Sequence, residues 1–147
     1  MNLKIILDDG AIMPTRAHAH DAGLDLYAQE GRIIEAKESA IFDTGVHVLI
    51  PEGYVGLLMS KSGLNVKYGL TSEGVIDASY TGSIVVKLYN NSGFDYHVNS
   101  GFDYHVRTGD KISQLLIMPI ETPSLIQVND FAEKTERGSN GFGSSGR

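Results

Sequence analysis

Short apolar runs separated by turn-forming residues recur through this chain, and they constrain its fold more than any other feature. The runs lie at residues 4–7, 31–34, 40–42, 46–50, 54–58, 84–89 and 112–120, and Gly, Pro, Asn and Asp stand between them. Several runs alternate polar and apolar residues, which is the period of a half-buried strand. Frequent short strands with turn signals between them predict an all-β sandwich or barrel. We expect at most one short helix, within residues 60–69.

Size and composition narrow the class of protein. A chain of 147 residues with 41% hydrophobic residues suits one domain with a packed core. The net charge of -6 argues against direct nucleic-acid binding, because polyanion binders carry a basic surface. The absence of cysteine excludes disulfides, thiolate metal sites and cysteine nucleophiles. With no membrane-length apolar run and no signal-peptide pattern at the N-terminus, we expect a soluble, intracellular (cytoplasmic) protein with no membrane partner.

The octapeptide Asn-Ser-Gly-Phe-Asp-Tyr-His-Val occurs twice in tandem, at residues 91–98 and 99–106. Each copy starts with a turn signal and continues with strand-like alternation. Because eight is even, the insertion preserves the face to which each later side chain points. We expect one copy in the normal strand and the other extruded as a tolerated loop, since doubling a loop costs only about 0.6 kcal/mol. A lengthened hairpin that binds a partner is the alternative.

The last eleven residues, 137–147, consist mainly of Gly and Ser, with one aromatic ring and an arginine at each end. Glycines allow backbone N–H groups to approach an anion, and hydroxyl and guanidinium groups bind phosphate oxygens. A ring in flexible backbone can close over a planar base. The composition indicates a nucleotide lid, with Phe142 on the base and Arg137, Ser144 and Ser145 on the phosphates. A disordered terminus is the alternative that composition leaves open.

Two internal segments carry charged groups that could act on such a ligand. In Gly74-Val-Ile-Asp-Ala-Ser-Tyr-Thr-Gly82 we expect a hairpin that presents Asp77 as a general base and Tyr80 against a sugar. The segment at residues 60–64 combines a lysine, two serines and a glycine, which suits a phosphate-binding turn. A hairpin with a satisfied Asp and an ordinary polar turn are the respective alternatives.

Two further segments carry polar side chains inside strand-like runs. Asp25 lies in Ala-Gly-Leu-Asp-Leu-Tyr-Ala, where an exposed strand carboxylate is expected from the segment alone. Gln114 is an amide in an apolar run and needs a partner if it is buried. His18 and His20 could bind a metal, but without a third ligand at a recognisable spacing we expect a solvated loop.

The segments AGLDLYA, SKSGL, GVIDASYTG, GDKISQL and RGSNGFGSSG stand in this order and span the chain from residue 22 to the C-terminus. Together they closely resemble the motifs of the trimeric dUTP diphosphatase (dUTPase) family. The resemblance implies a jelly-roll-like β-barrel at residues 1–136 and a flexible C-terminal lid at residues 137–147. It also implies a homotrimer with shared active sites, each lined by the third motif of a neighbour and closed by the tail of another subunit. The implied reaction is Mg²⁺-dependent hydrolysis of dUTP to dUMP and pyrophosphate, which keeps uracil out of DNA.

The resemblance also implies a role for individual residues. Asp77 corresponds to the aspartate that activates water, and Tyr80 to the ring that excludes a 2′-hydroxyl. Asp25 corresponds to the carboxylate that contacts the metal indirectly, through water. The remaining positions, implied to bind uracil or the phosphates, are Lys61, Ser62, Gly63, Gly74, Ile76, Gln114, Arg137, Phe142, Gly143, Ser144 and Ser145.

The chain departs from the family pattern in three places. Lys61 stands where arginine is usual, which keeps the charge but loses the bidentate fork. Thr71 occupies the approximate place of an asparagine used on uracil, so base discrimination is expected to rest more on backbone groups. The duplication lengthens the connection between the third and fourth motifs. A dCTP deaminase-like activity would need a glutamate in place of Asp77, and a nucleotide-gated interaction module using the inserted hairpin is a second alternative.

Overall fold

The computed structural model describes residues 2–93 and 101–140, which contain one helix and ten strands. The helix is α1 (Ser62–Tyr68), inside the window expected for it. The strands are β1 (Lys4–Leu7), β2 (Leu24–Tyr27), β3 (Arg32–Ile34), β4 (Ser39–Leu49), β5 (Tyr54–Met59), β6 (Leu70–Thr71), β7 (Glu73–Ile76), β8 (Ser83–Asn90), β9 (Tyr104–Val106) and β10 (Lys111–Pro119). The predicted all-β fold with one short helix is confirmed.

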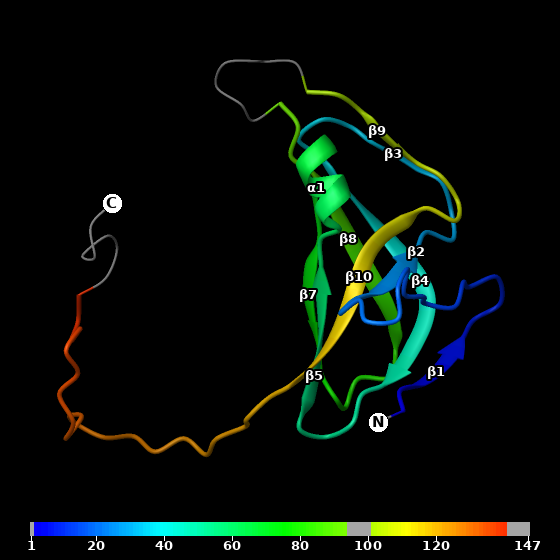
Figure 1. The fold of residues 1–147 in the computed structure, drawn as a ribbon. Helices are drawn as coiled ribbons and strands as arrows, with labels where there is room; N and C mark the ends of the chain where they lie inside the picture. Colours follow the sequence, from blue (N-terminus) through cyan, green and yellow to red (C-terminus); the bar gives the residue numbers. More distant parts are fainter. Residues whose placement is uncertain (1, 94–100, 141–147) are drawn as a thin grey trace.

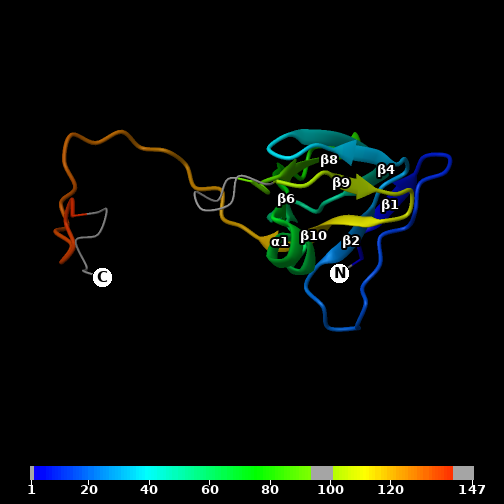
Figure 2. The same ribbon diagram turned by 90° about the horizontal axis from the view of Figure 1, so that it is seen from above.

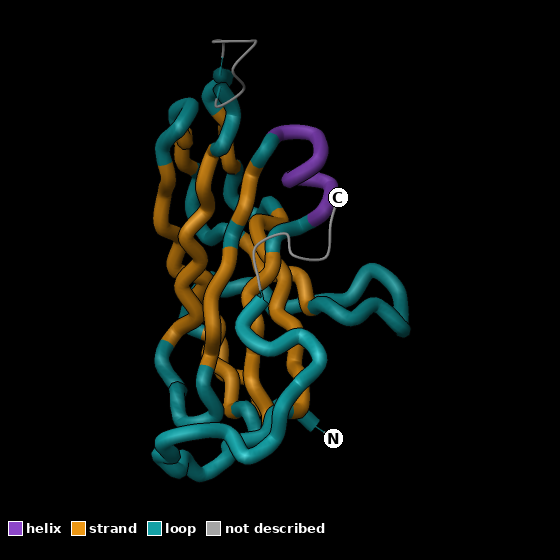
Figure 3. Tube along the Cα trace, turned by 90° about the vertical axis from the view of Figure 1, so that its left-hand side faces the viewer, coloured by secondary structure: helices purple, strands orange, loops and turns teal. Residues whose placement is uncertain are grey.

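The strands form two four-stranded sheets and a two-stranded ribbon (Figures 1 and 3). One sheet has the order β1-β4-β8-β6, the other β2-β10-β5-β7, and β3 pairs with β9. Both large sheets contribute to a single core, as in a jelly-roll-like sandwich. Its fully buried large side chains are Phe42, Leu26, Ile34, Ile50, Leu70, Ile84, Leu88, Ile112 and Leu115. The alternation of β8 buries every second residue, which is the pattern that predicted a strand there.

The apolar runs at residues 40–42 and 46–50 belong mainly to one long strand, β4, with a bulge in the middle. The register with β8 shifts between Asp43 and His47, and Gly45 has a φ of 63°. Glycine adopts this left-handed conformation without the strain that a Cβ would cause. The turn signal that appeared to separate two strands is therefore a bulge within one.

The segment around Asp77 is not the hairpin that its glycines predicted. β7 pairs with β5 in one sheet, whereas β8 pairs with β4 and β6 in the other. Residues 77–82 therefore form a crossover turn between the two sheets, closed by a hydrogen bond from Tyr80 N to Asp77 O of 3.0 Å. Strand and turn patterns are local, so they do not reveal which strands pair.

The second octapeptide copy supplies the regular strand, β9, which pairs with β3. The buried Asn90 side chain holds this junction, because its Nδ2 donates to the carbonyls of Ile34 (3.0 Å) and Phe102 (2.7 Å). Gly93 and Gly101, equivalent positions of the two copies, meet so closely that a Cβ on Gly93 would lie 2.9 Å from Gly101 Cα. The strand placement of one copy is confirmed; the expected extrusion falls on residues 94–100, outside the described residues.

After β10 the chain leaves the sheets as an arm, residues 120–140, that forms no helix or strand (Figures 1 and 2). The arm carries apolar side chains in the open: Leu125 is 95%, Ile126 83% and Phe131 82% exposed. The regular strands thus end at Pro119, and the division at residue 136/137 stays a prediction. Within the described residues, no helix has the length and hydropathy needed to cross a membrane.

Candidate active site

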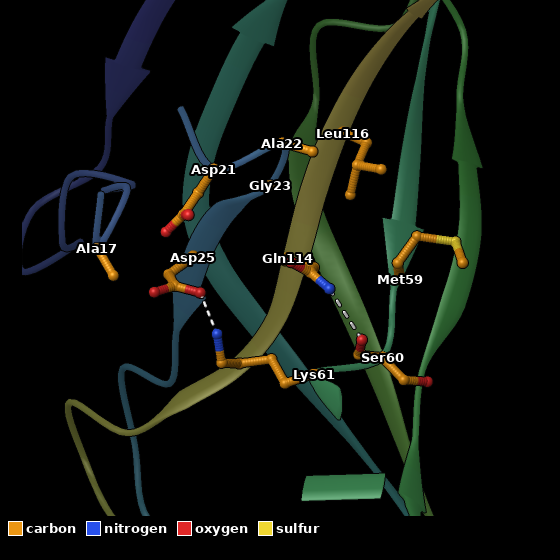
Figure 4. A pocket seen from close by; sticks show the side chains of 10 residues that line it. All are labelled: Ala17, Asp21, Ala22, Gly23, Asp25, Met59, Ser60, Lys61, Gln114 and Leu116. Carbon is orange, nitrogen blue, oxygen red and sulfur yellow. Dashed lines mark hydrogen bonds and ion pairs between the residues drawn. The ribbon is translucent and has the colours of Figure 1, made fainter. Parts of the chain in front are cut away.

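Three of the expected site residues, Asp25, Lys61 and Gln114, line one hollow of about 370 Å³ (Figure 4). They come from β2, from the residue before α1 and from β10, which are far apart in the sequence. The β2–β10 register places Asp25 directly opposite Gln114, and the register of β10 with β5 places Gln114 opposite Met59, next to the Ser60–Lys61 segment.

Asp25 is buried, with 5% of its surface exposed, so the expected exposed carboxylate is wrong. Its burial is compensated by two cations: Lys61 forms an ion pair with Oδ1, and Lys111 Nζ lies 2.7 Å from Oδ2. Burial alone would raise the pKa of Asp25, but hydrogen bonds from Lys111 and Lys61 outweigh it and lower the pKa below the usual value. Asp25 therefore remains ionised in a buried position.

Lys111 is a site residue that sequence reasoning missed, although it lies inside the GDKISQL segment. Its hydrogen bond to Asp25 raises the pKa of the Lys111 ammonium group. Strand and turn patterns are local, so they do not indicate that the Lys111 side chain reaches back to β2.

Gln114 is fixed by a hydrogen bond from its Nε2 to the Ser60 carbonyl of 3.0 Å (Figure 4). Its side chain lies over Gly23, where a Cβ would overlap the amide oxygen. The partner required by an amide in an apolar run is therefore the backbone beside Lys61. Gly23 is needed at this point for the space it leaves, not for an unusual φ.

Beneath these residues, buried hydroxyl groups connect three strands or strand ends. Ser72 and Ser113 have 3% and 0% exposure, and their Oγ atoms lie 2.9 Å apart. Ser113 Oγ also donates to Met59 O (3.1 Å), and Ser72 N donates to Ser60 Oγ (2.9 Å). Ser113, a hydroxyl inside the largely apolar run of β10, was the available signal for this network, which fixes the segment before α1 against β10.

Ser62 and Gly63 are exposed in the first turn of α1, directly after Lys61. Asn65 N donates to Lys61 O at 2.9 Å and starts the helical hydrogen bonding. The first residues of a helix leave their backbone N–H groups without helical partners. This turn can therefore offer donors to an anion near the hollow.

Asp77 and Tyr80 line a different hollow, of about 210 Å³, together with Val75, Ile76, Ser83 and Val85. Tyr80 lies across Gly82, and its hydroxyl donates to Ser83 O at 2.9 Å. Gly74 lies in β7, opposite Leu58 of β5. In the described part of the chain, the exposed Asp77 carboxylate forms no ion pair or hydrogen bond, so the fold does not occupy it.

The described part of the tail, residues 137–140, lines neither hollow. Arg137 belongs to the arm, where its Nε donates to Asn140 O at 2.8 Å. Phe142, Gly143, Ser144 and Ser145 lie outside the described residues. His18 and His20 are exposed in a loop, as expected, and residues 2–93 and 101–140 contain no group of three or more His, Cys, Asp or Glu that could hold a metal.

Comparisons with known proteins agree with the order of the motifs. The dUTPase family model matches residues 9–146. The deoxyuridine 5'-triphosphate nucleotidohydrolase of Yarrowia lipolytica is 42% identical over 150 residues, covering 99% of this chain and 90% of that protein. The solved structure of the Staphylococcus bacteriophage 80alpha dUTPase with dUpNHpp has a TM-score of 0.89 and 38% identity, covering 99% of each chain.

A mutant dUTPase from phage phi11 of S. aureus, whose structure reveals the coordination of a structural Mg(II) ion, has a TM-score of 0.78 and 36% identity. That similarity covers 89% of this chain and 99% of the phage protein. The motif order, the strand topology and the similarity over nearly the full length lead to one conclusion: this chain belongs to the dUTPase family.

Proposed function

We propose that the chain hydrolyses dUTP to dUMP and pyrophosphate, with Asp77 as the general base. The observation that carries this role is the state of the Asp77 carboxylate, which is exposed on the crossover turn and unused by the fold among the described residues. Other exposed carboxylates exist, but Asp77 alone stands at the motif position of the catalytic aspartate. Family membership and the related nucleotidohydrolases support the substrate.

In the proposed reaction, Asp77 accepts a proton from a water molecule as the water oxygen bonds to the α-phosphorus. The bond from that phosphorus to the bridging oxygen breaks, and pyrophosphate leaves. General-base assistance of this type contributes about 10² to 10⁴ in rate. The Tyr80 ring, which packs on Gly82, contacts the deoxyribose and excludes a 2′-hydroxyl.

The phosphate side is formed by Lys61, Gln114 and the first turn of α1. Lys61 brings positive charge, and the Gln114 amide orients the segment that contains Lys61 through its hydrogen bond to Ser60 O. Lys61 already pairs with Asp25, so its charge is shared between the protein and the triphosphate. Arginine would present two parallel N–H groups to a phosphate, whereas lysine acts as a point charge.

The residues present fit a Mg²⁺ ion carried by the triphosphate. Magnesium is commonly held by one or two carboxylates, waters and substrate phosphates, without a protein cage. Each Asp25 oxygen faces one ammonium group and retains a second lone pair, so this carboxylate can still accept a hydrogen bond from a metal-bound water. Bound there, the ion would neutralise phosphate charge and orient the triphosphate.

We also propose a homotrimer with shared sites. Asp25 and Asp77 line separate hollows that have no lining residue in common, so a complete set of groups requires a second chain. The arm supports this assembly, because exposed side chains such as Leu125, Ile126 and Phe131 need an apolar surface to cover them. The end of the arm and the residues after it then reach a neighbouring site, with Arg137, Phe142, Gly143, Ser144 and Ser145 as its lid.

The decisive experiment is a hydrolysis assay of the purified protein with Mg²⁺, with dUTP and the other nucleoside triphosphates as substrates. We expect pyrophosphate and dUMP from dUTP, and no ammonia from dCTP. Ammonia release from dCTP without dUTP hydrolysis would instead establish a deaminase.

The lid is tested by truncation after Glu136. The shortened protein should retain its oligomeric state in sedimentation and its thermal unfolding temperature, because Arg137 contacts only the arm itself within the described residues. Its kcat/KM for dUTP should fall strongly, since the lid excludes bulk water and completes the set of donors. Full activity of the truncated protein would remove the tail from the site.

A further inference from the structure

Two side chains beside the β4 bulge contact the crossover turn at the end that leads into β8. Asp43 Oδ1, on one side of the bulge, accepts a hydrogen bond from Ser83 Oγ. His47 Nδ1, on the other side, lies 2.9 Å from the Thr81 carbonyl. The two β4 side chains thus hold the residues before and after Gly82.

His47 makes a second contact through its other ring nitrogen. Nε2 lies 3.1 Å from Asp8 Oδ1, and Asp8 is itself held at the bulge by a hydrogen bond from its N to Gly45 O of 2.8 Å. A carbonyl and an ionised carboxylate can only accept hydrogen bonds, whereas a neutral imidazole has a single N–H. Only the doubly protonated ring satisfies Thr81 and Asp8 together.

The backbone held by these two contacts also supports the Tyr80 side chain. The Tyr80 hydroxyl donates to Ser83 O, and the ring lies so close to Gly82 that a Cβ there would overlap it. Thr81 follows Tyr80 directly, and Tyr80 N closes the turn onto Asp77 O. Movement of the Thr81 carbonyl would therefore displace both the sugar-contacting ring and the base.

We infer that His47, as an imidazolium bridging the Thr81 carbonyl and the Asp8 carboxylate, is a positioning residue for the crossover turn. When the ring loses a proton, one of the two contacts is lost and the turn is held less firmly. The inference rests on the proposed roles of Asp77 and Tyr80, because it concerns the same reaction.

The carboxylates of Asp8 and Asp43 favour the protonated form of His47. Asp8 follows β1 and Asp43 precedes the bulge, and Lys4 of β1 lines the same apolar hollow as the ring. The hydrogen bond to Thr81, followed by the one to Asp8, raises the pKa of His47 above 6.5 despite partial desolvation. For a raised pKa, the stabilisation is complete below 6.5 and is lost as the pH rises through the folded-state value.

The test compares kcat/KM for dUTP in the wild type and His47→Gln from about pH 5.5 to about pH 9. Glutamine is neutral and does not titrate, and the matched control is His105→Gln, which changes an exposed histidine of β9. The ratio of wild type to His47→Gln should be about three- to tenfold at low pH. It should fall toward one at high pH, with an inflection at the His47 pKa measured by NMR, while the ratio for His105→Gln stays near one.

Asp8→Asn provides a second, independent variant in case His47→Gln is unstable. It keeps an acceptor but removes the charge, so the inflection should move to lower pH. A pH-independent ratio for His47→Gln, or an unchanged inflection in Asp8→Asn, would overturn the inference. Asp77→Asn separates a failure of the proposed function from a failure of the positioning role. Retained turnover in Asp77→Asn refutes the proposed base. If Asp77→Asn is inactive and the kcat/KM ratio of wild type to His47→Gln does not change with pH, only the positioning role is refuted.

Discussion

The two central aspartates of this protein occupy opposite environments. Asp25 is buried and paired with Lys61 and Lys111, whereas Asp77 is exposed and makes no such contact in the described part of the chain. Two ion pairs keep Asp25 charged at the cost of its freedom to move or react. Asp77 is positioned only through the backbone of its turn, which leaves its carboxylate available to a water molecule. One carboxylate thus belongs to the framework of the site, and the other is left for chemistry.

Of the variants that test this comparison, Asp77→Asn should have the largest effect on activity. The amide keeps the shape of the side chain but cannot act as a base, so kcat should fall by about 10² to 10⁴. The thermal unfolding temperature should remain unchanged, because the carboxylate makes no ion pair or hydrogen bond to any described residue. Steady-state kinetics and a thermal melt measure both quantities, and substantial turnover by the variant would exclude the proposed role.

Gly82→Ala and Gly23→Ala test the two sides of the site through matched changes. Neither glycine has a positive φ, so the backbone accepts alanine and the new Cβ acts on its neighbour, Tyr80 or Gln114. A displacement near 1 Å can cost about 10²-fold in rate, which is an upper bound for each variant. Gly82→Ala should also weaken the preference for dUTP over UTP, whereas Gly23→Ala should lower activity without changing that preference.

The substrate preference is the informative readout of this pair. If both variants alter the ratio of dUTP to UTP hydrolysis equally, the sugar and phosphate roles are not divided between the two hollows as proposed.

Asp25→Asn should mainly reduce stability. It leaves two lysines facing a neutral amide, and losing hydrogen bonds to a charged group costs about 1 to 3 kcal/mol, toward the lower end here because both lysines are partly exposed. The pKa of Asp25 is lowered, so its contribution is present above the unfolded value of 3.8 and is lost as the pH falls through the folded value. Urea unfolding measures this at neutral and acidic pH. The difference in the free energy of unfolding between variant and wild type should be smaller at acidic pH.

Deletion of one octapeptide should have the smallest effect. Removing residues 99–106 or residues 91–98 yields the same sequence, because the copies are identical and adjacent. Because Gly93 and Gly101 lie against each other, the backbone of the shortened chain can connect at this point with little conformational change. Asn90 keeps its hydrogen-bond partners. Stability and dUTP hydrolysis should stay close to wild type. Loss of the oligomer in sedimentation would contradict the tolerated insertion.

Much of the fold could be predicted because its signals are local. The alternation in β8 and the single helical window around α1 follow from side-chain periodicity. The motif order indicated the family and brought attention to Asp25, Lys61, Gln114 and Asp77. Periodicity failed where pairing mattered: the β4 bulge looked like a break between strands, and the crossover turn looked like a hairpin.

The sequence by itself determined most of the strands, the helix, the family and the chemical groups available to the site. Tertiary structure alone decided how those groups are used. Asp25 meets Lys61 across 36 residues, and His47 meets Asp8 across 39. Such contacts depend on strand order and register, which bring distant side chains together and set their burial and charge. Within the described residues, the same residue type therefore becomes a buried ion-pair partner at Asp25 and an exposed carboxylate with no ion pair or hydrogen bond at Asp77.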